Sequence, residues 1–203
     1  IGHLYKGKGM EVIEKLSLVL NNVGFHIIGG TNNDIKYWKE KIKNENVYFY
    51  GFVNQQEIKN YVNSVDICLL PNQKIILTHG NESKINISEY TSPLKMFEYM
   101  AARKAIVSSD LAVLREVLNE NNSILVNYDN IKEWENAIEK LQNLTFREKI
   151  SQQAYKDFMS KYSWNIRAKK IIDVINYMKI WKKTNFLIFS ENMYHEQALF
   201  INF

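Results

Sequence analysis

The sequence has a single cysteine and no long apolar run, and each shortage argues against a class of protein. The single cysteine, Cys68, lies in an apolar stretch and cannot form an internal disulfide. That pattern argues against a disulfide-stapled secreted scaffold and favours a reducing cytosol. No run of about 18 apolar residues and no signal peptide are visible, so we expect no transmembrane helix and a cytoplasmic location.

Charge and motif patterns narrow the possible functions further. The 26 basic and 22 acidic residues are dispersed, so nucleic acid is not an expected partner, although a local positive pocket for a diphosphate remains possible. The four histidines have neither HxxxH nor cysteine–histidine spacing, so we expect no metal site. No GxSxG or P-loop motif occurs, and Gly29-Gly30 alone is too little for a dinucleotide fingerprint, which argues against a nicotinamide-dependent oxidoreductase.

Short apolar strands alternate with amphipathic helices along most of the chain. Parallel strands joined by right-handed crossovers explain such an alternation, so the fold class predicted is α/β, a doubly wound parallel sheet of Rossmann-like type. Its ligand crevice should lie at the carboxyl ends of the strands. The predicted strands cover residues 25–28, 47–52, 65–70, 105–108 and 124–126, and the predicted helices cover 10–20, 33–43, 55–63, 111–119, 131–141, 146–161 and 164–181, with one more starting at Pro93.

The segment from Thr91 to Ala102 carries the clearest chemical signal. Pro93 suits the first position of a helix, which makes Ser92 its N-cap. The next backbone N–H groups, of Leu94 and Lys95, then point out of the positive end of the helix, where a phosphate can bind. Glu98 follows within two turns, and its carboxylate can accept two hydrogen bonds from vicinal hydroxyls, as ribose recognition requires.

This segment resembles the donor-nucleotide motif of retaining GT-B glycosyltransferases of family four, also called group 1, in the variant S-P-L-K-x-F-E-Y-M-A. Other parts of the chain resemble the same family in the same order. They are the opening Gly2-His3-Leu4 with Lys8-Gly9, the strands at 25–30 and 47–53, the strand and exit at 66–71, and Tyr162-Ser163-Trp164. The resemblance covers roughly residues 1–180 and implies the C-terminal, donor-binding half of a GT-B fold.

The resemblance implies a set of functional residues. Lys8 would act on the α- or β-phosphate and Glu98 on the ribose, and these two are the predicted catalytic residues. The predicted nucleotide-sugar-binding residues are Gly2, His3, Lys8, Phe52, Val53, Glu89, Tyr90, Thr91, Ser92, Pro93, Leu94, Lys95 and Glu98. Each also has a structural reading, as a loop lysine, a strand end or a helix-surface charge. No metal or other cofactor is implied beyond the nucleotide-diphosphate sugar itself.

Two departures from the family pattern concern sugar handling. The usual motif has two glutamates with seven residues between them, but counting back from Glu98 puts Tyr90 at the first position, and Glu89 is one place away. Either a one-residue bulge brings Glu89 into place or the Tyr90 hydroxyl replaces the carboxylate. In addition, Arg103 stands where a glycine is usual and Ala105 where a proline is usual.

The implied function is sugar transfer with retention, of hexosyltransferase type, in bacterial surface polysaccharide or lipopolysaccharide synthesis at the inner face of the membrane. Peripheral membrane contact would come through the full-length protein. The alternative is a noncatalytic nucleotide-sugar-binding or scaffold module whose active-site loop has drifted. Ile1 reads as mid-strand, so we expect a fragment without its acceptor-binding N-terminal domain, inactive alone. Residues 1–176 form the predicted nucleotide-sugar-binding domain, and the aromatic tail 177–203 is expected to dock on the absent domain.

Overall fold

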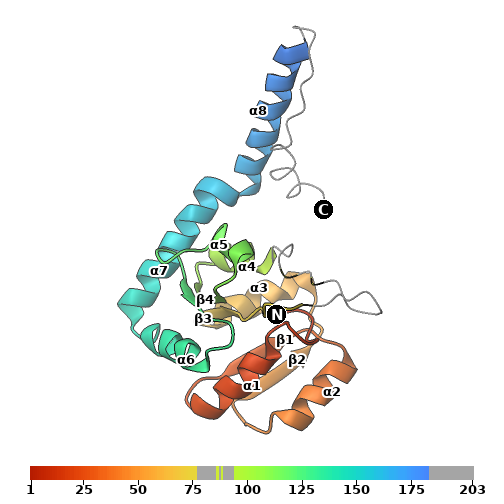
Figure 1. Cartoon of the computed structure of the whole chain (residues 1–203), viewed down its shortest axis with the longest axis vertical. Helices are drawn as coiled ribbons and strands as arrows, with labels where there is room; N and C mark the ends of the chain where they lie inside the picture. The colour runs from red at the N-terminus through yellow and green to blue at the C-terminus, as the bar shows by residue number, and fades with distance from the viewer. Residues whose placement is uncertain (77–85, 87, 89–93, 183–203) are drawn as a thin grey trace. The chain divides into compact units, whose positions relative to one another are not determined.

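The computed structural model describes residues 1–76, 86, 88 and 94–182 of the 203-residue chain. The chain divides into two compact units, Ile1–Ser160 and Lys161–Phe203. The first unit contains all five strands and most of the helices that the structure describes (Figure 1). The predicted domain boundary at residue 176 falls within a continuous helix of the second unit, α8, which spans Trp164–Lys182.

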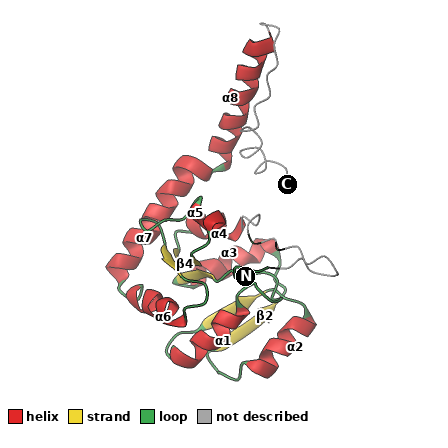
Figure 2. Cartoon of the chain, in the orientation of Figure 1, coloured by secondary structure: helices red, strands yellow, loops and turns green. Residues whose placement is uncertain are grey.

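Helices and strands alternate through the first unit, as the sequence pattern predicts (Figure 2). The strands are β1 (Phe25–Ile28), β2 (Val47–Gly51), β3 (Ile67–Leu70), β4 (Ala105–Ser109) and β5 (Ile124–Val126). The helices are α1 (Met10–Val19), α2 (Asn32–Lys41), α3 (Gln55–Ser64), α4 (Leu94–Ala101), α5 (Ala112–Arg115), α6 (Ile131–Lys140) and α7 (Leu144–Asp157), followed by the π-helical turn η1 (Phe158–Tyr162).

All pairings between the described strands are parallel, which confirms the predicted α/β class. The strands form two sheets rather than one: a two-stranded sheet of order β1-β2 and a three-stranded sheet of order β3-β4-β5. β1 and β3 are therefore edge strands. In the first sheet, β2 carries one extra residue opposite the step from Ile27 to Ile28.

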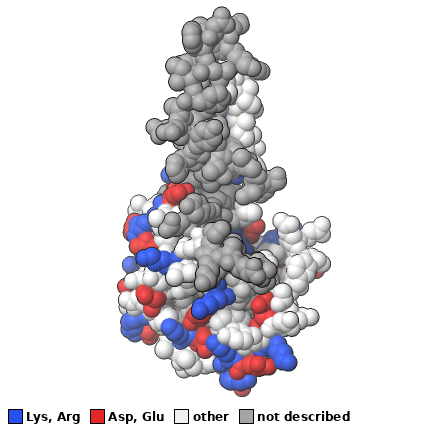
Figure 3. Space-filling model, turned by 45° about the vertical axis from the view of Figure 1, so that its right-hand side comes forward, with Lys and Arg blue, Asp and Glu red and all other residues white. Residues whose placement is uncertain are grey.

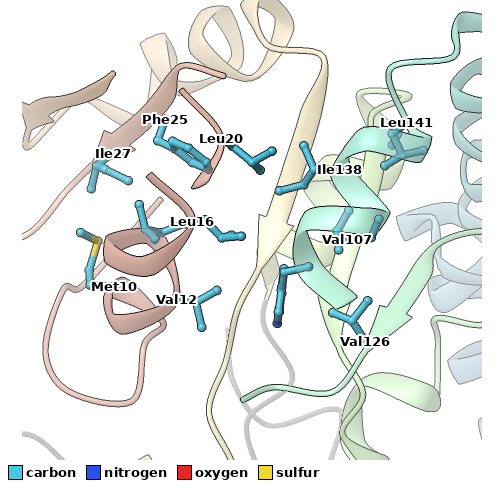
Figure 4. Close-up of a cluster of buried hydrophobic side chains, with 14 of the residues drawn as sticks. Met10, Val12, Leu16, Leu20, Phe25, Ile27, Val107, Val126, Ile138 and Leu141 are labelled. Carbon is cyan, nitrogen blue, oxygen red and sulfur yellow. The ribbon is translucent and has the colours of Figure 1, made fainter. Parts of the chain in front are cut away.

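The hydrophobic core of the first unit is continuous across both sheets. Leu16 of α1 is fully buried and belongs to one cluster with Phe25 of β1 and Val107 of β4. Figure 4 shows the α1 side chains between those of β1 and that of Ile138 on α6. Trp134 of α6 is fully buried in the same cluster and donates its indole N–H to the carbonyl of Asn127 at 3.1 Å. Helix α1 thus packs against both parts of the unit.

The helix predicted over 111–119 is only four residues long, because side chains compete for its backbone groups. Asn122 is buried, accepts from the Asn119 amide at 2.8 Å and donates to the Val117 carbonyl at 3.1 Å. An asparagine that bonds the backbone this way stabilises a turn in place of further helix. The remaining elements agree with the predicted ranges to within a few residues at their ends.

The second unit consists, in its described part, of helix α8. Its apolar side chains are distributed around the helix rather than on one face, and several are exposed: Ile171, Ile172, Val174, Ile175, Tyr177 and Met178. The predicted docking tail from 177 to 203 lies mostly outside the described residues, and its docking role stays a prediction.

We expect Gly9→Ala to destabilise the first unit by about 2–5 kcal/mol, because it combines backbone strain with a steric clash. Gly9 caps α1 with a φ angle of 98°, and an added Cβ would lie 2.3 Å from Cγ of Pro71. The matched control is Gly51→Ala, where φ is also positive, at 72°, but the nearest atom to an added Cβ is 3.6 Å away.

The control should cost only about 1–2 kcal/mol, the strain of the left-handed conformation. Chemical denaturation of both variants and the parent provides the comparison. Equal losses for the two variants would contradict the tight contact between Gly9 and Pro71.

Candidate functional site

A cavity of about 940 Å³ opens in the first unit between the N-terminal segment, β1, β3 and α4. Four of the predicted site residues line it, namely His3, Lys8, Leu94 and Lys95. They come from two segments more than 80 residues apart in sequence, and the fold brings them together at one site. The size is within the range of small-molecule sites, about 300–1,000 Å³.

Lys8 is held in place by the backbone of a tight loop between Ile1 and α1. Its amide donates to the Tyr5 carbonyl at 3.1 Å, and its ammonium lies 5.3 Å from the centre of the Tyr5 ring. The neighbouring Gly7 donates to the Glu11 carboxylate at 3.3 Å and accepts from the Gln73 amide at 3.0 Å. The loop that carries Lys8 is therefore anchored to α1 and to the segment that leaves β3.

Lys95, in the first turn of α4, brings a second positive charge to the cavity. Its ammonium lies against Gly2, since a Cβ added there would be 1.9 Å from Nζ. Burial and, to a smaller extent, the nearby charge of Lys8 lower the pKa of Lys95 to about 8, while Glu98 acts in the opposite direction. Among the described residues, neither Lys8 nor Lys95 has a carboxylate within ion-pair distance. Two ammonium groups without a carboxylate partner create a site suited to an anion.

Glu98 lies one turn after Lys95, on the same side of α4, and its side chain is exposed. It does not line the cavity itself, but it is close enough to interact electrostatically with Lys95. Phe52 and Val53 follow the end of β2 and are not among the lining residues either. The Phe52 side chain is 83% exposed. None of these three residues forms part of the cavity wall.

Of the remaining predicted residues, one lies next to Lys95 and five belong to a segment that the structure does not describe. Gly2 contacts Lys95, as noted above. The five residues from 89 to 93 lie outside the described residues, so the predicted N-cap and the choice between two motif positions stay predictions. They are Glu89, Tyr90, Thr91, Ser92 and Pro93.

Tyr99 was not predicted as a site residue, although it lies at the cavity. Tyr99 of α4 lines the cavity, and its burial raises the pKa of the phenol well above its usual value. Its position, one turn after Lys95 on the apolar side of the helix, is a signal that sequence reasoning could have used.

The described residues contain neither a candidate metal site nor a candidate membrane span. No three histidine, cysteine, aspartate or glutamate side chains there are grouped so that they could bind a metal ion. Within the same residues, no helix has the length and hydropathy of a membrane span. Basic and acidic side chains are interspersed over the described part of the face in Figure 3.

Residues 1–143 match the family description "Glycosyl transferases group 1". The chain belongs to the glycosyl transferases group 1 family. The match includes Lys8, Lys95 and Glu98, so the residues around the cavity lie within the matched region. A curated relative, an uncharacterized glycosyltransferase of Methanocaldococcus jannaschii, is 27% identical over 184 residues, covering 86% of this chain and 43% of the relative. This chain thus spans less than half the length of that relative.

Solved structures of glycosyltransferases share this fold. The C-terminal domain of the group 1 family protein LpcC of Francisella tularensis superposes with a TM-score of 0.64 at 20% identity, covering 81% of this chain and 84% of that one. HepE of Anabaena, solved in complex with UDP, gives a TM-score of 0.68 at 15% identity, covering 87% of this chain and 48% of that one. At this identity the likeness shows the fold, a GT-B glycosyltransferase fold of Rossmann-like type.

We expect the Lys95 ammonium to titrate near pH 8, well below an ordinary lysine, because it is buried beside another cation. Lys8→Met should raise the pKa of Lys95 by removing the repulsion. Glu98→Gln should lower it by removing the attraction. NMR of the labelled lysine side-chain Nζ and Cε nuclei would follow each titration, with Lys43, an exposed lysine, as the internal reference. A Lys95 pKa near 10.4 that ignores both substitutions would show that the two charges do not share one site.

Proposed function

We propose that this domain binds the nucleotide-sugar donor of a glycosyltransferase that transfers a hexosyl group to an acceptor with retention of configuration. The observation that carries this proposal is the convergence of Lys8 and Lys95 on one cavity, without a carboxylate partner among the described residues. In a group 1 family member, a diphosphate is the anion that suits such a pair. HepE of Anabaena, which shares this fold, has been solved in complex with UDP and with UDP-glucose, and this supports a nucleotide sugar as the ligand class.

The chemistry follows from where charge develops during transfer. When the bond between the sugar and the diphosphate breaks, negative charge grows on the departing phosphate oxygens. The ammonium groups of Lys8 and Lys95 and the amino-terminal end of α4 would stabilise this charge, because they are held in place before the reaction starts. Lys8 therefore has the catalytic role, and the stabilisation needs no metal ion in this proposal.

Recognition of the nucleoside would use the residues around the cavity. Glu98 is exposed and one turn from Lys95, so its carboxylate is available to accept hydrogen bonds from two ribose hydroxyls. The base would then extend toward Gly51, Phe52 and Val53 at the end of β2. The exposed Phe52 side chain offers an apolar surface there.

The full-length enzyme would need an acceptor-binding domain in addition to this one. The chain covers 43% of its curated relative, which leaves room for such a domain. We place the reaction in bacterial surface polysaccharide or lipopolysaccharide synthesis, in the cytoplasm at the inner face of the membrane, and we expect the 203-residue chain alone to be inactive. A noncatalytic nucleotide-sugar-binding module is the second candidate, favoured by Tyr90 at the position of a usual glutamate.

Calorimetric titration with UDP, GDP and ADP and with the bare nucleosides tests the binding role directly. Lys8→Ala should weaken binding of the diphosphate by about 1–3 kcal/mol and leave nucleoside binding unchanged, since an ammonium acts on phosphate alone. Glu98→Gln should weaken both ligands by about 1–3 kcal/mol, because both carry the ribose.

The two variants serve as controls for each other, since each alters one charge at the same site. Lys43 is exposed and does not line the cavity, so Lys43→Ala should behave as the parent. No binding of any nucleotide by the parent, or equal losses of nucleoside and diphosphate affinity in Lys8→Ala, would refute the proposed site.

A further inference from the structure

The Tyr5 ring packs against two of the predicted site residues. Its centre lies 5.3 Å from the Lys8 ammonium and 5.7 Å from the centre of the His3 ring. Both of those residues line the cavity, whereas Tyr5 is not among the lining residues. Tyr5 is therefore placed to act on a ligand through its neighbours rather than by touching the ligand itself.

A tight turn brings the Tyr5 and Lys8 side chains together. The Lys8 amide donates to the Tyr5 carbonyl at 3.1 Å, which is the hydrogen bond between the first and fourth residues of a β-turn. The third residue, Gly7, has a φ angle of 89°, and a type II turn requires a positive φ at that position. Such a turn holds its first and fourth α-carbons within about 7 Å of each other, so the ring and the ammonium can meet.

The backbone of this turn is anchored on both sides. Leu4 is buried, and its carbonyl accepts a hydrogen bond from the indole N–H of Trp38 at 2.9 Å. A Cβ added to Gly7 would lie 2.4 Å from a backbone carbonyl oxygen of the segment that follows β3. Because the turn is fixed, the Tyr5 ring has a defined place, whereas the flexible stem of Lys8 needs a partner to hold its ammonium.

An aromatic ring can hold an ammonium group without neutralising it. The ring attracts a cation within about 6 Å of its centre through its quadrupole, but it carries no net charge. Among the described residues, no carboxylate lies within ion-pair distance of Lys8. A carboxylate would compete with a phosphate for the ammonium, whereas the Tyr5 ring leaves the positive charge available to an anion.

We propose that Tyr5 is a positioning residue for diphosphate binding, and that its ring holds the Lys8 ammonium at the cavity in the conformation that meets the phosphate. This inference rests on the proposed function for the identity of the ligand. The ring restricts the rotamers of Lys8 before the ligand arrives, so less side-chain entropy is lost on binding.

Calorimetric titration with UDP, or with GDP or ADP if the parent prefers it, and with the matching nucleoside tests the proposal. Tyr5→Leu removes the ring and should weaken diphosphate binding by about two- to fivefold, as expected for an ammonium on a partly exposed ring, without affecting the nucleoside. Tyr5→Phe keeps the ring and should bind as tightly as the parent. Tyr37→Leu is the matched control and should also bind as the parent does. The Tyr37 ring lies 4.9 Å from the Lys41 ammonium, but neither residue lines the cavity.

A double-mutant cycle shows whether Tyr5 acts through Lys8. In the Lys8→Ala background, Tyr5→Leu should cause no further loss of diphosphate affinity, because the group that the ring holds is gone. NMR of the Lys8 side chain is a second measurement and needs no ligand. The ring should shift the Lys8 Cε protons upfield in the parent and in Tyr5→Phe, and this shift should disappear in Tyr5→Leu.

Three outcomes would overturn the proposal while the parent still binds a nucleotide. They are an equal loss of diphosphate affinity by Tyr5→Leu with and without Lys8, an equal loss for the nucleoside, and Lys8 resonances that Tyr5→Leu does not change. A parent that binds no nucleotide would refute the proposed function and this proposal together. If Tyr5→Leu does not fold, Tyr5→Met takes its place, since a flexible methionine fills irregular space without an aromatic face.

Discussion

The contact of the N-terminal segment with the carboxyl ends of β1 and β3 is the constraint on which the rest of the site depends. Gly2 bonds the end of β1, and the loop around Gly7 and Gly9 packs on the exit of β3. Only a backbone without side chains can approach Pro71 as closely as Gly9 does. This contact sets Lys8 in front of α4, where Lys95 completes the pair. Without it, the loop of Lys8 and the helix of Lys95 would not be brought together.

The electrostatics of the pair explain how the site can favour an anion. Burial lowers the pKa of Lys95, and repulsion by the nearby Lys8 ammonium lowers it in addition. An anion that binds between them would relieve the repulsion and recover the lost solvation. The binding free energy of a diphosphate would therefore include the relief of the repulsion between the two ammonium groups. The exposed Glu98 carboxylate acts against this repulsion, because its negative charge raises the pKa of Lys95.

The strands and most helices could be predicted from the sequence because the apolar periodicity within each of them is strong. This pattern is local, so it does not depend on contacts between distant segments. The sequence predicted the convergence of Lys8 and Lys95 only through family resemblance, since no local pattern links residues so far apart. It did not predict the division into two sheets, because strand pairing depends on contacts between segments that are far apart in the sequence. The short α5 was also missed, since the side-chain bonds of Asn122 that replace the helix are set by the local turn. The roles assigned to Phe52, Val53 and residues 89–93 stay predictions.

The most direct measurement is the affinity of the domain for a nucleoside diphosphate between pH 7.5 and 9.5. A bound anion raises the pKa of Lys95, so the protonated lysine is the form that binds, and the free domain loses that proton as the pH rises through about 8. The association constant should therefore fall with rising pH, by up to about tenfold per unit above pH 8. In Lys95→Met the association constant should be lower at pH 7.5 and nearly constant over the range. The same pH dependence in parent and variant would contradict the claim that the diphosphate binds at the Lys8–Lys95 pair.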